Sequence, residues 1–182
     1  MSSKSIVAQR PFQLSLLASV ALAAACASAP AFSATTTAAA TADVVTPIAI
    51  TKASDLVFGR FIAGPGGTVT VSTAGLRTVS GVTASGGTTP TTASFNITGE
   101  AGTAYAISID TSDTKLVSGA NQMNLELFSD LTGAGATSGK VSAGLLGAGG
   151  TQTLYVGGKL TVGADQAAGQ YSGTIAALVN YN

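Results

Sequence analysis

Residues 171–181 have the sequence Tyr-Ser-Gly-Thr-Ile-Ala-Ala-Leu-Val-Asn-Tyr, and this stretch decides the fold. It contains no charged side chain, and in an extended chain every second residue faces the same side. The residues that share one side are Tyr171, Gly173, Ile175, Ala177, Val179 and Tyr181. Their unbroken alternation predicts a β-strand that buries one face and continues to the penultimate residue.

The same period-two alternation recurs along the chain. Thr68 to Ser72 alternates valines with hydroxyl side chains, and Ala93 to Thr98 and Tyr105 to Ile109 also place apolar residues on one side. Further strands are predicted by a series of apolar pairs and triplets spaced two apart. They are Ile48/Ile50, Leu56/Phe58, Met123/Leu125/Leu127, Leu154/Val156 and Leu160/Val162, with one more short strand near Val141.

Glycine divides these apolar segments. The chain has 23 glycines, so long helices are almost excluded and turns are frequent. Gly99-Glu100-Ala101-Gly102 predicts a hairpin turn, and Gly157-Gly158 predicts a turn between two strands. The pattern predicts an all-β fold, an immunoglobulin-like antiparallel β-sandwich of seven to nine strands, with a closed barrel as the alternative.

The N-terminus has the features of a signal peptide. Lys4 and Arg10 precede an apolar run, Leu14 to Ala25, which is too short for a membrane anchor. Cleavage after Ser33 is favoured over cleavage after Ala29, and lipidation at Cys26 is a weaker alternative. The predicted organisation is a signal peptide at 1–33, a flexible arm at 34–47 and a β-sandwich domain at 48–182.

Composition excludes several classes of function. Charged residues make up 9%, the formal net charge is zero, and there is no His and a single Cys. Nucleic-acid binding needs a basic surface, and zinc or imidazole chemistry needs ligands that this sequence lacks. No second long apolar run exists, so no membrane span is predicted for the mature chain.

Catalytic patterns are also missing. None of the four mature lysines, Lys52, Lys115, Lys140 and Lys159, lies in a nucleophile motif, and most acidic residues fall at predicted turns. Asp110 to Asp113 is interpreted as a turn rather than a calcium loop, because no further acid follows at a suitable spacing. We therefore expect no enzymatic activity, no catalytic residue, no cofactor, no metal and no small-molecule substrate.

The C-terminal stretch resembles the signature of chaperone–usher pilus subunits. Gly169 lies fourteenth from the end, the apolar residues alternate after it, and Tyr181 is a penultimate aromatic. Gly67 to Val71, Asn96 to Glu100, Leu154 to Gly163 and Gly169 to Thr174 also resemble an uncharacterised family of secreted proteobacterial domains, a domain of unknown function. That family is similar to spore coat protein U and the archaic pilins, and the resemblance covers about Ile48 to Tyr181.

The resemblance implies a structural role. In pilus subunits the last strand borders an open groove, which a periplasmic chaperone fills first and the N-terminal arm of a like subunit fills later. Carried over to this chain, the groove residues are Gly169, Tyr171, Gly173, Ile175, Ala177, Val179 and Tyr181, and the donor residues are Val44, Ile48 and Ile50. Pro47 is a departure, because it removes a hydrogen-bond donor from that arm.

The expected function is therefore a secreted, pilin-like subunit of a surface fibre or coat in the periplasm or on the cell surface of a Gram-negative bacterium. Its expected partners are a periplasmic chaperone and like subunits. The alternative is a self-contained secreted β-sandwich that binds a surface polysaccharide or protein. An enzyme that uses only Asp and Glu is the third and weakest hypothesis.

Overall fold

The computed structural model describes residues 32–110 and 115–182. The chain divides into two units, residues 1–41 and residues 42–182. In the first unit, residues 32–41 carry no strand and are exposed. The predicted apolar segment of the signal peptide, Cys26 and most of the Asp110 to Asp113 turn lie outside the described residues.

The second unit is all-β. Its described residues contain no helix, and so none that could cross a membrane, and every strand pairing among them is antiparallel. Twelve strands occur in the described ranges. They are β1 (Ala49–Ser54), β2 (Arg60–Ile62), β3 (Gly67–Val71), β4 (Arg77–Ser80), β5 (Thr83–Ser85), β6 (Ala93–Thr98), β7 (Ala104–Ile109), β8 (Lys115–Ser118), β9 (Asn121–Asp130), β10 (Ala143–Leu145), β11 (Thr151–Val162) and β12 (Ala177–Tyr181).

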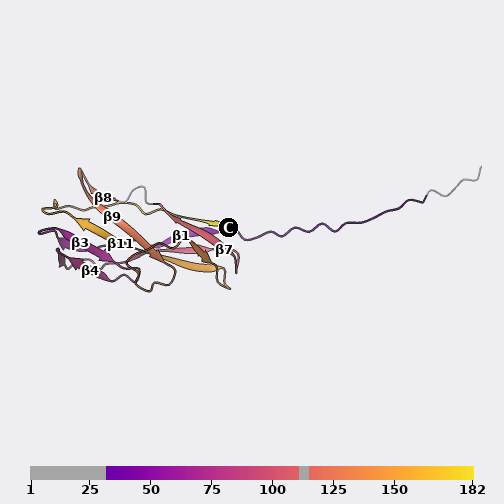
Figure 1. The fold of residues 1–182 in the computed structure, drawn as a ribbon, viewed down its shortest axis with the longest axis horizontal. Helices are drawn as coiled ribbons and strands as arrows, with labels where there is room; N and C mark the ends of the chain where they lie inside the picture. Colours follow the sequence, from indigo (N-terminus) through magenta and orange to yellow (C-terminus); the bar gives the residue numbers. More distant parts are fainter. Residues whose placement is uncertain (1–31, 111–114) are drawn as a thin grey trace, which may run out of the picture. The chain divides into compact units, whose positions relative to one another are not determined.

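The main sheet is built around β11. Strand β9 pairs with residues 155–161 along one edge of β11, while β6 pairs with residues 151–156 and β3 with residues 158–162 along the other edge. Strands β1, β4 and β8 extend the sheet by pairing with β6, β3 and β9 (Figure 1). The result is one curled sheet in the form of a half-barrel.

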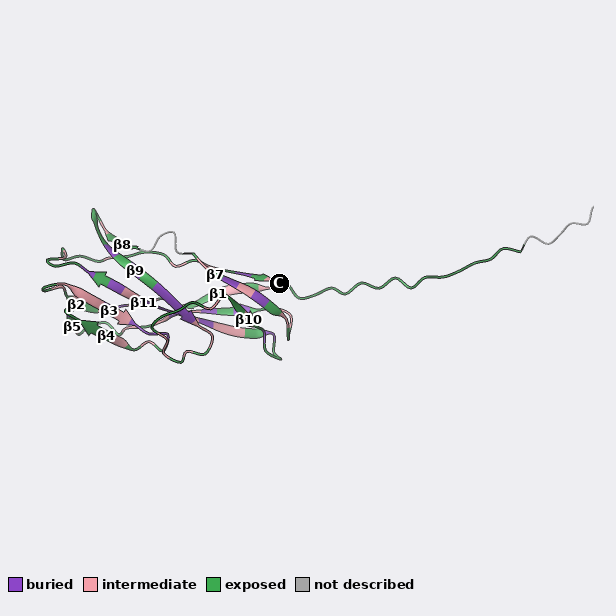
Figure 2. Ribbon diagram, viewed as in Figure 1, coloured by how far each residue is buried: buried purple, intermediate pink, exposed green. Residues whose placement is uncertain are grey.

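Two smaller sheets complete the fold. Strand β7 lies between β10 and β12, and β2 pairs with β5. The small sheet β10-β7-β12 contributes Tyr105, Ile107 and Val179 to the same core as Ile97 and Leu154 of the main sheet. Figure 2 shows the alternation of buried and exposed residues along β9 that this packing produces. The core therefore lies between the concave face of the main sheet and the small sheet.

The predicted alternation is confirmed in the strands that build this core. Val69 and Val71 are fully buried in β3, and β6 has the predicted bounds with Phe95 and Ile97 inward. Burial of these side chains away from water stabilises the fold by roughly 25 cal/mol for each Å² of apolar surface removed. The short strand predicted near Val141 lies slightly later, as β10.

The predicted turn at Gly157-Gly158 is wrong, because both glycines lie inside the continuous strand β11. A β-carbon at Gly157 would stand 2.5 Å from the Val71 carbonyl oxygen, and one at Gly158 would stand 2.9 Å from a methyl group of Leu125. These glycines let neighbouring groups approach the centre of the sheet closely. They do not bend the chain.

The turn at Gly99–Gly102 is present, but it does not form the predicted hairpin. Thr103 N donates to Glu100 O across it. Strand β6 before the turn belongs to the main sheet, and β7 after it belongs to the small sheet, so the two strands do not pair. The turn carries the chain from one sheet to the other.

The last strand is shorter than the alternation predicts. Only Ala177–Tyr181 form β12, and residues 171–176 are extended with a single bridge between Ser172 and Val117. Gly173 lies against β8, where a β-carbon would stand 2.7 Å from the Lys115 carbonyl oxygen. Gly173 is therefore crowded against β8 at the point where the regular strand pairing of the C-terminal segment is interrupted.

Candidate functional site

The C-terminal segment forms a sheet edge. Strand β12 pairs only with β7 among the described residues, with Tyr181 opposite Tyr105 and Ala177 opposite Ile109. Asn182 N donates to Ala104 O at the end of this ladder. Neighbouring residues of a strand direct their backbone groups to opposite edges. The odd-numbered residues of β12 therefore direct their N–H and C=O groups away from β7.

The same parity continues upstream of β12. Ser172 exchanges two backbone hydrogen bonds with Val117 of β8, at 3.0 and 2.9 Å, and Ala176 O accepts from Asp110 N at 2.9 Å. These even-numbered residues pair with their own domain. Within the described parts of the chain, no backbone hydrogen bond engages Tyr171, Gly173 or Ile175. The register shifts by three residues between the Ser172–Val117 bridge and the β12–β7 ladder, so the 171–175 segment and β12 are two separate stretches of edge.

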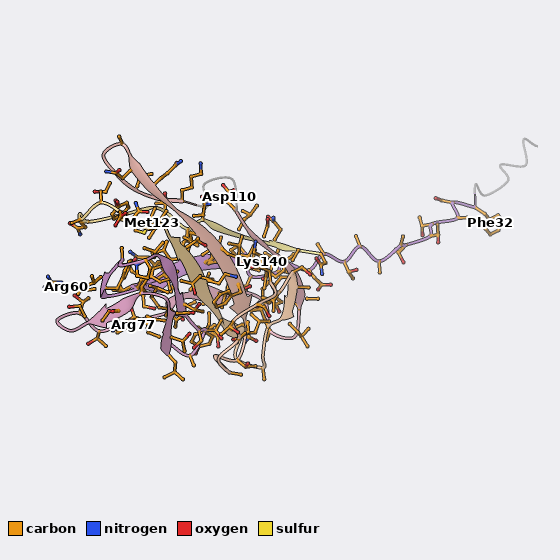
Figure 3. The ribbon with its side chains drawn as sticks, turned by 60° about the vertical axis from the view of Figure 1, so that its left-hand side comes forward. Phe32, Arg60, Arg77, Asp110, Met123 and Lys140 are labelled. Carbon is orange, nitrogen blue, oxygen red and sulfur yellow. The ribbon has the colours of Figure 1, made fainter. Side chains whose placement is uncertain are left out.

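A cleft of about 1400 Å³ lies beside the first half of this edge. One wall is residues 165–175 and the other is residues 52–64. Its floor is the concave face of the main sheet, contributed by Phe95 of β6, Met123 of β9 and Leu160 of β11. Figure 3 labels Met123 on β9. The cleft is a trough with an apolar floor and a lining of mixed polar and apolar groups. Its two walls are chain segments that do not pair with each other among the described residues.

The walls present side chains that are only partly buried. They are Leu56, Phe61, Leu116, Tyr171 and Ile175. Gly158 helps to form the trough, because a β-carbon there would meet Leu56 at 3.0 Å and Phe58 at 3.1 Å. Its absence lets residues 56–58 lie close to the sheet. These wall side chains would gain further burial if an apolar strand filled the cleft.

The seven groove residues predicted from the sequence divide into two groups. Gly169, Tyr171, Gly173 and Ile175 line the cleft. Ala177, Val179 and Tyr181 belong to β12, beyond the lined part of the cleft, and pack against the core. Of the seven predicted residues, only Gly169, Tyr171, Gly173 and Ile175 border the open volume.

The three predicted donor residues are also separated. Ile50 lies in β1 opposite Ile97 of β6, and Ile48 packs against the same core. Val44 is 99% exposed and precedes β1. The structure therefore places Ile48 and Ile50 in the domain's own sheet and core, and leaves Val44 outside.

Sequence reasoning did not identify Thr46 and Glu100. Thr46 N donates to Glu100 Oε2 at 3.0 Å, and the Tyr181 hydroxyl donates to Thr46 O at 2.7 Å. Glu100 N donates to the Tyr181 hydroxyl oxygen at 2.6 Å. The hydrogen bonds from Thr46 lower the pKa of Glu100 below its usual range. No sequence signal joins residues so far apart in the chain.

Charges lie at the rim of the cleft. Lys52 Nζ and Asp55 Oδ1 form an exposed ion pair at 2.8 Å. Arg60 and Arg77 lie at one end of the domain (Figure 3), where the Arg77 guanidinium donates to the carbonyl oxygens of Phe58 and Arg60. Arg77 thus fixes the wall segment that follows β1. The exposed Lys52–Asp55 ion pair, in contrast, contributes little to stability.

The described residues contain no group of three or more metal-ligating side chains. Among the described residues, the cleft is bordered by backbone groups without a backbone partner, at Tyr171, Gly173 and Ile175, and by an apolar floor. An extended peptide uses both when it adds to a sheet.

Fold and site together define an all-β domain with three features: a curled antiparallel sheet, a small facing sheet and an open trough with an apolar floor beside the C-terminal segment. Residues 48–181 match the family described as Domain of unknown function (DUF4402), and the chain belongs to this family. No curated protein and no solved structure matches the chain.

Proposed function

We propose that this chain is a secreted, pilin-like structural subunit that assembles into or onto a bacterial surface fibre or coat by β-strand donation. Its place would be the periplasm or cell surface of a Gram-negative bacterium, after removal of residues 1–33. Its partners would be like subunits and a periplasmic chaperone that covers the cleft before assembly. No enzymatic step belongs to this role.

One observation carries the proposal: Tyr171, Gly173 and Ile175, whose backbone groups form no backbone hydrogen bond within the described residues, border a cleft with an apolar floor. An exposed sheet edge with apolar surroundings favours association with another chain unless it is covered. The edge has no charged residue from Tyr171 to Tyr181 that would oppose pairing. A donated strand would satisfy the backbone groups and cover the partly buried wall side chains at once.

We interpret the domain as an immunoglobulin-like sandwich that lacks one strand at the cleft. The small sheet β10-β7-β12 and the main sheet share one core, as two layers of a sandwich do. The missing strand would lie between residues 165–175 and residues 52–64, which flank the cleft. The similarity to spore coat protein U and to archaic pilus subunits rests on this interpretation and on the C-terminal pattern.

The donor segment that fits best is the arm before β1. Ile48 and Ile50 already pack in their own domain, so the part left to donate is residues 34–45. Within it Ala38, Ala40, Ala42 and Val44 alternate with Ala39, Thr41 and Asp43, and all of them are exposed. These small side chains would fill shallow positions along the cleft, and the backbone ladder would supply much of the attraction.

The test is expression of the full chain and of a variant that lacks residues 34–45, which leaves β1 intact. Surface material is separated by SDS gel electrophoresis with and without heating. Strand-donated polymers should remain as a ladder in unheated SDS and collapse to one band after heating. Unchanged ladders in the deletion variant would exclude strand donation by the arm.

A second candidate function is a self-contained binding module for a surface polysaccharide or protein. It is favoured by the burial of Ile48 and Ile50 in the chain's own core and by the hydrogen bond between Tyr181 and Thr46. This candidate predicts a stable monomer in size-exclusion chromatography of the secreted protein, with a single cooperative melt. Concentration-dependent association of the same material would count against it.

A further inference from the structure

Thr46 is held at both ends of its peptide backbone. Its N–H donates to the Glu100 carboxylate at 3.0 Å, and its carbonyl oxygen accepts from the Tyr181 hydroxyl at 2.7 Å. Glu100 N closes the ring by donating to the same Tyr181 oxygen at 2.6 Å. We call these three residues the Thr46 clamp. It joins the segment before β1, the turn after β6 and the end of β12.

The turn is shaped to receive the Tyr181 hydroxyl. A β-carbon at Gly99 would overlap that oxygen, and would lie 3.0 Å from a methyl group of Leu146. Glycine at this position therefore permits the close approach that the clamp needs. The clamp also requires the hydroxyl of Tyr181, the penultimate residue, which a phenylalanine at this position would lack.

The clamp lies directly before Pro47, a residue that favours a tight turn of the chain. Proline fixes its own φ and is favoured as the second residue of a β-turn, in which the preceding carbonyl accepts a hydrogen bond two residues beyond the proline. Here that carbonyl is Thr46 O, and the residue beyond is Ala49. Tyr181 engages Thr46 O, and Ala49 pairs with Thr98 in β1. The tight turn that the sequence favours here would need Ala49 to leave its pairing with Thr98, and the hydrogen bonds of the clamp hold Thr46 in the non-turn position.

That turn would send residues 42–45 back along β1, towards the cleft of the same molecule. A segment tethered to its own binding site has an effective concentration in the millimolar range. Self-insertion would therefore compete strongly with donation to another molecule. A chain built to polymerise needs a feature that disfavours the reversal.

We propose that the Thr46 clamp is this feature: it keeps residues 42–45 from turning back along β1, so that the cleft is filled by the arm of a second copy of this chain. The inference rests on the proposed function, because it assigns the partner of the same cleft. Glu100 and Tyr181 are positioning residues in this device. They do not contact the donated strand.

The experiment locates the arm by chemical cross-linking. Cys26, the native cysteine, is replaced by Ser in the full chain, and Ala40→Cys and Thr174→Cys place one thiol on the arm and one at the cleft. Thr174 is exposed and lines the cleft. A bis-maleimide then joins thiols that lie close together. Mixed single-cysteine chains report donation between molecules, and the double-cysteine chain at high dilution reports self-insertion.

With the clamp intact, we expect cross-linked dimers and ladders from the mixture and a minor intrachain product from the double-cysteine chain. Tyr181→Phe and, separately, Glu100→Ala should increase the intrachain product several-fold and shorten the ladders. Glu100→Ala truncates a partly exposed side chain, so it tests the clamp even if Tyr181→Phe impairs folding. Tyr155→Phe is the control. The Tyr155 ring packs against Gly133, outside the clamp, so removal of its hydroxyl should change neither the intrachain product nor the ladders.

Two results overturn the inference in distinguishable ways. An intrachain product that is unchanged by both clamp variants, or that already dominates with the clamp intact, refutes the role of the clamp while leaving strand donation standing. The absence of any cross-link between the arm thiol of Ala40→Cys and the cleft thiol of Thr174→Cys, in either format, refutes the proposed function itself, and the clamp's role with it.

Discussion

A β-carbon at Gly157 would overlap the ring of Phe128, its partner across the β9–β11 ladder. Phe128 is 1% exposed although it alternates with the inward-facing Leu125 and Leu127. It is therefore buried on the convex face of the main sheet, separately from the main core. Hydrogen bonds from Ser129 N to Gly139 O and from Thr73 N to Ala136 O hold the following loop in place.

Gly157→Ala should lower the free energy of unfolding by roughly 2–3 kcal/mol, because the new methyl group overpacks both the Phe128 ring and the backbone at Val71. The backbone carbonyl has little freedom to move aside. Urea unfolding followed by circular dichroism measures the loss. Gly86→Ala is the control, since nothing lies within 4 Å of a β-carbon there, and equal effects of the two substitutions would contradict the close-approach explanation.

Asp130 is expected to make the domain sensitive to acid. Partial burial alone would raise the pKa of this carboxyl, but hydrogen bonds from the Thr73 hydroxyl and from the amides of Gly133 and Thr132 outweigh it and lower the pKa. A lowered pKa contributes stability that is present at neutral pH and is lost as the pH falls below the usual Asp value towards the folded one.

Asp130→Asn should therefore cost about 1 kcal/mol at pH 7, a figure reduced for solvent screening, and less at pH 3. Unfolding in urea at the two pH values measures the difference between variant and wild type. Glu100 and Glu126 also have lowered pKa values, so the comparison with wild type isolates Asp130. Asp43→Asn, at an exposed position, serves as control; a pH-independent cost for Asp130→Asn would contradict the account.

Alternation in the sequence predicted the strands that bury a complete face. In β3 the inward residues are Val69 and Val71, and in β6 they are Phe95 and Ile97. A strand with apolar residues at every second position can bury them only by turning that one face to the core. Alternation does not specify a partner. The turn after β6 therefore looked like a hairpin turn, although the chain passes to a different sheet at Glu100.

The candidate site was predicted only in part, because alternation does not show which segments lie beside the last strand. The odd-numbered residues from Tyr171 to Tyr181 pack partly against the core or line the cleft, but where the cleft ends depends on contacts with distant segments. Gly173 lies against Lys115, and Thr46 bonds to Tyr181, across 58 and 135 positions in the chain. Contacts at that separation leave no local pattern. Ile48 and Ile50 likewise fit a donor strand and an ordinary first strand equally well.

Tyr105→Phe should leave stability unchanged or raise it by up to about 1 kcal/mol. The Tyr105 hydroxyl is buried and has no hydrogen-bond partner among the described residues, which disfavours the folded state. Burial also raises the pKa of Tyr105, so stability should fall as the pH rises through the usual tyrosine range. Thermal melts at pH 7 and above pH 10 measure both effects, and the Phe variant should lose part of the alkaline sensitivity.

Tyr171→Phe is the matched contrast, because that hydroxyl accepts from Gln166 Nε2 and donates to Ala167 O, both at 2.8 Å. Its loss should destabilise the domain by about 1 kcal/mol. If Tyr105→Phe proved as destabilising as Tyr171→Phe, the hydroxyl of Tyr105 would have to form a stabilising hydrogen bond, and this account would be wrong.

Gly173→Ala should detach the cleft-bordering segment from β8. The new methyl group would stand 2.7 Å from the Lys115 carbonyl oxygen and 2.9 Å from a methyl group of Leu116, next to the bridge between Ser172 and Val117. Because the carbonyl belongs to the strand backbone, the 171–175 segment must move instead. Hydrogen exchange of the Ser172 and Val117 amides should accelerate by more than tenfold while amides of β11 are little changed.

Gly149→Ala, where the nearest atom is 3.9 Å away, should leave all of these rates as they are. Unaltered exchange at Ser172 in Gly173→Ala would mean that the bridge does not set the position of the edge, and the cleft would then owe its shape to residues 52–64.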